Sequence, residues 1–234
     1  LSPDSVAAVL VEPIQGEGGF VVPPKGFLKS LSELCSRYNI LLIADEIQTG
    51  FGRTGRYFAS EHEDVVPDIM AVGKSLAAGL PVGAVCGTAE VMDGPIVAGL
   101  GSTMAGSPVT CAAALAVLDI MEEEQIIERA IKIGDHLLNR FQDFQNRHAI
   151  IGDVRGLGAM IALELVEDRT TKEPAVEATS NIINYCQDAG LIVPRGGIYS
   201  NVIRPLFPLT ITFDDLDNGL DILDKALGIA SNNL

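Results

Sequence analysis

Residues 41–55 read LLIADEIQTGFGRTG, and this stretch decides the fold. Its opening apolar run is long enough for one buried strand and too short for most helices, and it stops at two acids, the first being Asp45. A second apolar run, residues 69–72, leads within two residues to Lys74. In an open parallel sheet, ligands bind at the carboxyl ends of the strands. We therefore expect Asp45 and Lys74 to lie at the edge where chemistry takes place.

A strand-end lysine and a strand-end aspartate together suit one kind of chemistry. A desolvated lysine loses its proton more easily and becomes a nucleophile that forms Schiff bases with carbonyl groups. A nearby carboxylate keeps a pyridinium nitrogen protonated, which makes a pyridoxal ring an electron sink. For an isolated pair, a salt bridge at a loop edge is the commoner explanation. The residues that flank Asp45 and Lys74 decide between the two interpretations.

Three motifs contain these residues in an order typical of one enzyme family. Residues 45–55 match the pattern D-E-[IV]-Q-[ST]-G-x-G-R-T-G, and residues 72–79 (VGKSLAAG) are similar to the lysine segment F-[AGS]-K-[SG]-[IL]-[AG]-[GA]-G. Upstream, residues 11–19 (VEPIQGEGG) are similar to the element E-P-x-Q-G-E-G-G. The chain therefore resembles the class III (omega) aminotransferases over essentially its whole length, above all those that act on 4-aminobutyrate.

The resemblance implies a pyridoxal 5′-phosphate enzyme of fold type I. It assigns Lys74 to hold the cofactor covalently and to serve as general base and acid, and Asp45 to pair with the pyridine nitrogen. Gln48 is expected to hydrogen-bond the phenolic oxygen of the ring. Thr103, in a second glycine-rich stretch, is expected to offer its hydroxyl to the phosphate across the dimer interface, and Glu12 to hold its loop or neighbouring polar groups.

Arg204 lies in an expected strand, where an inward guanidinium is costly without an anionic partner. Pairing with a local Asp or Glu is the simpler explanation. The resemblance implies instead that Arg204 clamps the α-carboxylate of the substrate through two hydrogen bonds. It also implies that Glu17 covers Arg204 when an ω-amino acid such as 4-aminobutyrate is bound. Glu17 then swings away for 2-oxoglutarate or glutamate, so the expected reaction gives succinate semialdehyde and glutamate.

The order of apolar runs predicts an α/β protein in two parts. Residues 1–124 are expected to form the C-terminal part of the cofactor-binding large domain, with a mainly parallel sheet, and residues 125–234 a small α/β domain. Strands are expected at 6–11, 41–45, 68–72, 82–87, 153–155, 160–166, 191–194 and 202–206, and helices at 25–38, 56–63, 90–93, 109–124, 175–189 and 214–230. An amphipathic helical pattern begins at 125. The helix at 109–124 is apolar almost all round, so we expect it to be buried.

The length and the first residues predict that the chain is a fragment. It has 234 residues and begins at Leu1 rather than at Met, whereas the family that it resembles has chains about twice as long. The resemblance implies the C-terminal half of a homodimer or a dimer of dimers, inactive by itself.

Charge and composition exclude several classes of partner. The net charge of −15 and the scattered Lys and Arg residues argue against nucleic acid and anionic membranes. No apolar run reaches the length of a membrane-spanning helix. The four cysteines have no C-x-x-C spacing, which favours reduced, buried thiols and a cytoplasmic protein. The three histidines are scattered, so no metal site is predicted.

Alternatives remain open at this stage. An acetylornithine, ornithine or diaminobutyrate aminotransferase would share Asp45, Gln48 and Lys74. The combination of Glu17 with Arg204 favours 4-aminobutyrate among these. Outside enzymology, the chain could be a non-catalytic fragment that folds and self-associates.

Overall fold

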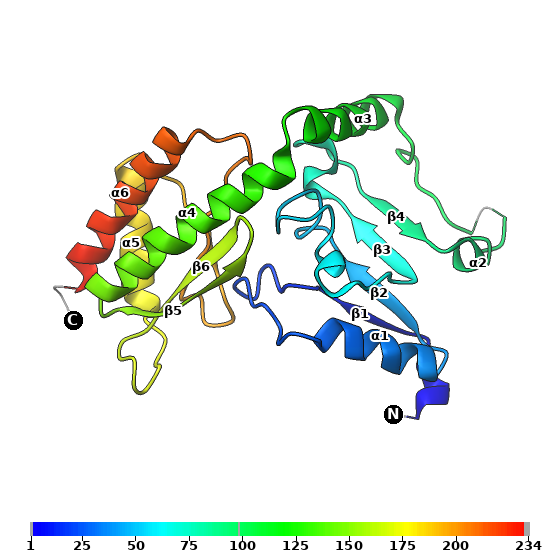
Figure 1. Ribbon diagram of the computed structural model, residues 1–234, viewed down its shortest axis with the longest axis horizontal. Coiled ribbons are helices and arrows are strands. Elements are labelled where there is room, and N and C mark those ends of the chain that lie inside the picture. The colour runs from blue at the N-terminus through cyan, green and yellow to red at the C-terminus, as the bar shows by residue number, and fades with distance from the viewer. Residues whose placement is uncertain (1, 98, 232–234) are drawn as a thin grey trace. The chain divides into compact units, whose positions relative to one another are not determined.

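The structure, a computed structural model, describes residues 2–97 and 99–231. It divides into two compact units (Figure 1). Unit 1 consists of Leu1–Ile14 and Pro23–Ile127, and unit 2 of Gln15–Val22 and Glu128–Leu234. The eight-residue segment 15–22 thus belongs to unit 2, although the chain on both sides of it belongs to unit 1.

Unit 1 is built on a four-stranded sheet in which the first three strands are parallel. The order is β1 (Ala8–Val11), β2 (Leu41–Asp45), β3 (Ile69–Val72) and β4 (Ala84–Gly87), with β4 antiparallel to β3. The α/β class and the mainly parallel sheet are confirmed. The strand at residues 41–45 has the predicted bounds, whereas β1 begins two residues later than expected.

Helix α1 (Phe27–Arg37) connects β1 to β2 and supplies much of the core of unit 1. Leu28 and Cys35 on α1 pack with Leu42 of β2 and with Val65. The helix begins after Gly26, and a carboxylate distant in sequence caps it. Glu63 accepts hydrogen bonds from the backbone N–H groups of Gly26 at 2.6 Å and Lys29 at 2.9 Å. Such a carboxylate satisfies N–H groups that have no partner within the helix.

The rest of unit 1 consists of short helices and one long one. These are the 3-10 helices η1 (Pro3–Ser5), η2 (Ala59–Glu63) and η3 (Lys74–Ala77), then α2 (Ala89–Met92) and α3 (Pro108–Glu123). The prediction that α3 is buried is wrong, because Val109 and Leu115 on it are 70% and 64% exposed. The element that packs on α3 in unit 1 is the single turn η3, which is too short to cover a helix of 16 residues.

Unit 2 combines a small antiparallel sheet with three helices. The strand order is β5 (Ile151–Leu157), β6 (Met160–Leu165), β8 (Val202–Ile203) and β7 (Arg195–Gly196), and the helices are α4 (Ile126–Arg147), α5 (Val176–Asp188) and α6 (Phe213–Ser231). The amphipathic pattern of α4 is confirmed, and its apolar face is buried. The core contains side chains that are at most 1% exposed: Ile133, Leu137, Phe141, Phe144, Ile150, Ile151, Met160, Leu163, Leu165 and Ile182.

The strand expected at residues 191–194 does not form. The N–H of Leu191 donates to the carbonyl of Cys186 at 2.8 Å and so closes α5, and Pro194 has no N–H to donate. Two of its four residues therefore have no N–H to offer to a sheet, and the strand begins at Arg195. Gly190, the residue after the cap of α5, has a left-handed backbone (φ 89°), as is common for a glycine at the end of a helix.

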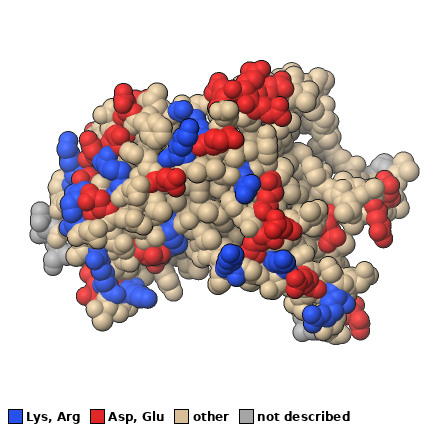
Figure 2. Space-filling model, in the orientation of Figure 1, with Lys and Arg blue, Asp and Glu red and all other residues tan. Residues whose placement is uncertain are grey.

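The surface carries more acid than base. Figure 2 shows basic side chains scattered among acidic ones on the face that it displays. In the part of the chain that the structure describes, no helix combines the length and apolarity needed to cross a membrane. Cys35 and Cys186 are buried as predicted, whereas Cys86 and Cys111 are exposed, and all four are free thiols.

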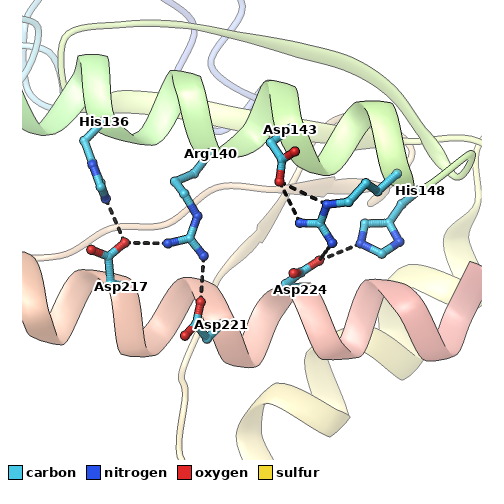
Figure 3. A network of polar contacts seen from close by, with 8 residues as sticks. His136, Arg140, Asp143, His148, Asp217, Asp221 and Asp224 are labelled. Atoms are coloured by element: carbon cyan, nitrogen blue, oxygen red, sulfur yellow. Dashed lines mark hydrogen bonds and ion pairs between the residues drawn. The ribbon is translucent and has the colours of Figure 1, made fainter.

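A row of ion pairs joins α4 to α6 in unit 2 (Figure 3). Asp217 accepts hydrogen bonds from His136 at 2.8 Å and Arg140 at 2.6 Å. Two helical turns further on, Asp224 accepts from Arg147 at 2.8 Å and His148 at 2.6 Å. Burial by itself raises the pKa of Asp224, but the hydrogen bonds from Arg147 and His148 outweigh it and hold the pKa below its ordinary value.

We expect Asp224→Asn to lower the free energy of unfolding at pH 7 by about 1–2 kcal/mol, because hydrogen bonds to charged groups contribute more than neutral ones. A carboxyl whose pKa is lower in the folded state contributes stability above its unfolded pKa and loses it as the pH falls through the folded pKa. The wild-type contribution should therefore be complete above about pH 4 and fade below it. Urea unfolding at pH 7 and below pH 4 measures both effects.

Asp143→Asn is the matched control, because Asp143 also accepts from Arg147 but is 59% exposed and lies four residues away on the same helix. Such a pair contributes at most about 0.5 kcal/mol. If both variants lost the same free energy of unfolding, Asp224 would contribute no more to stability than an exposed ion pair does.

Candidate active site

The ends of β2 and β3 bring Asp45 and Lys74 to the same edge of the sheet in unit 1. The register pairs Asp45 with Ala71, and the N–H of Glu46 donates to the carbonyl of Ala71 at 2.9 Å. Strand β3 ends at Val72, and Lys74 opens the turn η3 two residues later. Because neighbouring parallel strands end together, an acid and an amine follow them at one edge.

Lys74 has an unusual backbone and an exposed side chain. Its φ of 42° lies in the left-handed region, which few residues other than glycine adopt. Strain of this kind is concentrated at ligand-binding and catalytic positions. Eight other described non-glycine residues also have a positive φ, so this conformation is compatible with a functional role for Lys74 but does not by itself establish one.

Asp45 and Gln48 present polar atoms beside the same strand end. Asp45 is half-buried, and its Oδ1 accepts the N–H of Ile47 at 3.0 Å. Oε1 of Gln48 is buried and has no hydrogen-bond partner among residues 2–97 and 99–231. A buried polar atom without a partner costs free energy. A ligand with polar ring substituents would supply the missing partner, so these residues fit a pyridoxal group.

Glu46 is the functional neighbour that sequence reasoning missed. It is completely buried and accepts hydrogen bonds from the hydroxyl of Thr49 and from the N–H groups of Ala59 at 3.0 Å and Ser60 at 2.8 Å. Successive residues at a strand end point to opposite sides, so Asp45 and Glu46 face different surroundings. Glu46 ties the glycine loop to the start of η2, which fixes the loop that carries Gln48.

The loop itself is closely packed. A β-carbon built on Gly50 would lie 2.8 Å from the carbonyl oxygen of Glu46, so only glycine fits there. The rings of Phe51 and Phe58 meet edge to face with centroids 5.8 Å apart. Burial lowers the pKa of Arg53 to about 10.

Two further residues singled out from the sequence lie at other places in unit 1. Thr103 is exposed in the turn that precedes α3. Glu12 is exposed and directly follows β1. Since β1 pairs in parallel with β2, Glu12 lies at the same edge of the sheet as Asp45.

Unit 2 contains a separate cluster around Arg204. The guanidinium is buried, with 4% of the residue exposed, and its Nη2 forms an ion pair with the carboxylate of Glu17. Nη2 also reaches the carbonyl of Arg195 at 3.3 Å. Nε and Nη1 of Arg204 are buried without a partner among the described residues. Nη1 and Nη2 share one edge of the guanidinium, so an anion with a pair of oxygens can bind there once Glu17 has left Nη2.

The neighbours of Arg204 shape the space around it. The ring centroid of Phe20 lies 5.7 Å from the guanidinium carbon, within the range of a cation–π contact. A β-carbon on Gly196 would overlap Nε of Arg204 and lie 2.7 Å from its Cδ. Gly196 therefore leaves the room that the guanidinium occupies.

The family of the chain follows from comparison with known proteins. The family model for class-III aminotransferases matches residues 1–227. The chain belongs to this family, as its three motifs predicted.

Individual relatives agree with this assignment. The chain is 49% identical over 221 residues to the 5-aminovalerate aminotransferase DavT of Pseudomonas aeruginosa, covering 94% of this chain and 52% of that protein. It is 48% identical over 227 residues to a probable 4-aminobutyrate aminotransferase of Bacillus subtilis, covering 97% and 52%. An omega transaminase structure from Pseudomonas jessenii, in complex with PMP, superposes with a TM-score of 0.92 at 33% identity, covering 99% and 52%. The chain thus spans about half the length of the relatives it matches.

We expect Glu46→Gln to lower the free energy of unfolding by about 2–4 kcal/mol, because an amide places N–H groups against donors and leaves them unsatisfied in a buried site. Urea unfolding at pH 7 measures the loss. Glu61→Gln is the control: Glu61 accepts the N–H of Phe58 at 2.8 Å in the same turn but on the surface. That variant should lose about 0.5–1 kcal/mol, as at an exposed helix cap. Similar losses would show that Glu46 is an ordinary cap.

Proposed function

We propose that the protein is a pyridoxal 5′-phosphate-dependent aminotransferase for ω-amino acids. The observation that carries the proposal is the placement of Asp45, Gln48 and Lys74 at the ends of two neighbouring parallel strands in a class-III chain. The exposed strand-end amine, the half-buried carboxylate and the buried unpaired amide oxygen support it.

Lys74 would hold the cofactor covalently, Asp45 would face its pyridine nitrogen, and Gln48 its phenolic oxygen. Thr103 would contribute to binding of the phosphate in a neighbouring subunit, and Glu12 would support the loop at the same sheet edge. When bound, pyridoxal phosphate supplies an electron sink for the bond that is broken at the substrate carbon.

Lys74 also has the role of moving a proton. Its ε-amino group, when not bonded to the cofactor, would act as general base and acid and move a proton between the two carbons on either side of the substrate nitrogen. Asp45, as a carboxylate, favours a positive charge on the ring nitrogen that it faces. Glu46 has no part in the chemistry and holds the loop that positions Gln48.

The substrate class follows from Arg204 and Glu17. We propose that Nη1 and Nη2 of Arg204 clamp the α-carboxylate of glutamate or 2-oxoglutarate after Glu17 has left Nη2. With an ω-amino acid bound, Glu17 would pair with the guanidinium and neutralise it. The preferred reaction is the transfer of the amino group of 4-aminobutyrate to 2-oxoglutarate, which gives succinate semialdehyde and glutamate.

5-Aminovalerate is the second candidate donor, because a relative named for that substrate is 49% identical to this chain. Like 4-aminobutyrate, it has no α-carboxylate next to the reacting amine, so the same pairing of Glu17 with Arg204 serves both. A comparison of kcat/KM for the two donors separates them.

We further propose that residues 1–124 form the C-terminal part of the cofactor-binding large domain and 125–234 the small domain. The enzyme would work in the cytoplasm as a homodimer or a dimer of dimers. The four free thiols support a reducing compartment. Sedimentation of the full-length protein with cofactor tests the assembly.

Lys74→Ala in the full-length protein tests the proposed activity. We expect loss of transamination and loss of the visible absorbance of bound cofactor, because alanine has no amine with which to form the Schiff base. Borohydride reduction of the wild type followed by peptide mapping should place the cofactor adduct on Lys74. An adduct on another lysine would refute the assignment.

Glu17→Gln and Arg204→Ala test the substrate assignment in opposite directions. Glu17→Gln should impair the 4-aminobutyrate half-reaction far more than the glutamate half-reaction, because the guanidinium then keeps an uncompensated charge. Arg204→Ala should impair the glutamate half-reaction more, because only the α-carboxylate uses both donors. We expect each preference to be about tenfold or more in kcat/KM. Equal losses in both half-reactions would reduce the pair to a structural salt bridge.

A further inference from the structure

The segment that carries Glu17 is a short closed loop. Gln15 and Val21 form an isolated antiparallel bridge, with N–H to carbonyl distances of 3.1 and 3.2 Å. Inside it, the N–H of Gly19 donates to the carbonyl of Gly16 at 3.1 Å. Gly19 and Phe20 both have left-handed backbones, with φ of 108° and 52°. The loop therefore has a defined shape of its own, and its placement depends on where it is attached.

Contacts other than the ion pair of Glu17 with Arg204 also attach the loop to the rest of unit 2. Phe20 is completely buried beneath Arg204. The N–H of Gly197 donates to the carbonyl of Glu17 at 2.9 Å. Nε of Arg155 donates to the carbonyl of Gly19 at 2.9 Å. The first two contacts involve groups next to Arg204. The third comes from Arg155, which lies on β5.

The position of Arg155 on β5 explains why its guanidinium is fixed. Residues two apart on a strand share a face, so Arg155 and Asp153 lie together, and the register pairs Asp153 with Glu164 on β6. Nη1 of Arg155 donates to Asp153 at 2.9 Å and to Glu164 at 2.5 Å. The side chain is 18% exposed. The two carboxylates fix Nη1, and because the guanidinium is planar this also orients Nε toward the carbonyl of Gly19.

We propose that Arg155 is a positioning residue that holds the glycine loop so that Glu17 meets Arg204. It thereby sets how well the enzyme accepts donors without an α-carboxylate. This inference rests on the proposed function of Glu17 and Arg204 as a substrate-dependent pair.

The side chain of Glu17 is itself 74% exposed, so little protein packs around it. Its ion pair with Arg204 therefore depends on the position of its backbone. Loss of the bond to Gly19 frees one side of the turn and lowers the fraction of time for which the pair is formed. Donors that need the pair then bind less well, whereas glutamate and 2-oxoglutarate, which displace Glu17, are spared.

Hydrogen exchange of the full-length protein tests the structural part. Arg155→Met keeps the aliphatic stem and removes the donors. We expect the amides of residues 15–22 to exchange about tenfold faster in this variant, as local opening becomes easier. Arg169→Met is the matched control, because Arg169 also donates to backbone carbonyls in unit 2, those of Ile151 and His148, both at 2.9 Å. Unchanged exchange at 15–22, or equal acceleration in the control, would overturn the proposal.

Half-reaction kinetics test the effect on substrates. Arg155→Met should raise KM for 4-aminobutyrate about tenfold with little change in kcat, and leave the glutamate half-reaction within about twofold. Arg155→Lys, which retains one donor, should restore part of the loss. In a Glu17→Gln background, Arg155→Met should have no further effect, because it acts through Glu17. Additive losses in the double variant would overturn the proposal.

The two proposals fail in distinguishable ways. If Glu17→Gln changes neither half-reaction, the substrate-dependent pair is wrong, and with it the effect assigned to Arg155 on substrates. The exchange of residues 15–22 would still decide whether Arg155 holds the loop.

Discussion

The parallel pairing of β2 with β3 is the constraint on which the candidate site depends. With Asp45 opposite Ala71, both strands end at one edge, and the chain then turns immediately in each case. If the pairing of β2 with β3 shifted by one residue, every side chain of β2 would move to the other face of the sheet. Asp45 would then take the buried position that Glu46 occupies. The apolar strand residues hold that register, because Leu42 and Ala44 are buried in the core. Packing thus fixes the position of a carboxylate that takes no part in the packing.

The two neighbouring acids at the end of β2 show how one strand end serves both stability and chemistry. Glu46 has three donors and is completely buried, whereas Asp45 keeps most of its hydrogen-bonding capacity free. Unpaired buried atoms are costly, and within residues 2–97 and 99–231 they include Oε1 of Gln48 and two nitrogens of Arg204. These residues are the ones that the motifs assign to cofactor and substrate. Their unused polar atoms support a role in binding rather than in folding.

Much of this arrangement could be predicted from the sequence, because it depends on local patterns. The strand at 41–45, α1 and the left-handed Gly190 all follow from short apolar runs and turn residues. The exposure of α3 could not be predicted, because the sequence of an apolar helix does not show whether another element covers it. Nor could the role of Glu46, which depends on amides 13 and 14 residues away. The attachment of Gly19 to Arg155 spans 136 residues and leaves no periodic signal in the sequence.

Glu17 in the segment 15–22 combines a fixed backbone with an exposed carboxylate. Its backbone is held by the N–H of Gly197, and its loop by Arg155 and the buried ring of Phe20, while its carboxylate stays largely in solvent. A fixed backbone with a largely exposed side chain allows the carboxylate to leave Arg204 by rotation about side-chain bonds alone. Such rotation in an exposed residue takes nanoseconds or less, far faster than the motion of a loop. Under the proposed function, the exchange between the two substrate classes would then need no rearrangement of the fold, because rotation of one side chain suffices to free Arg204.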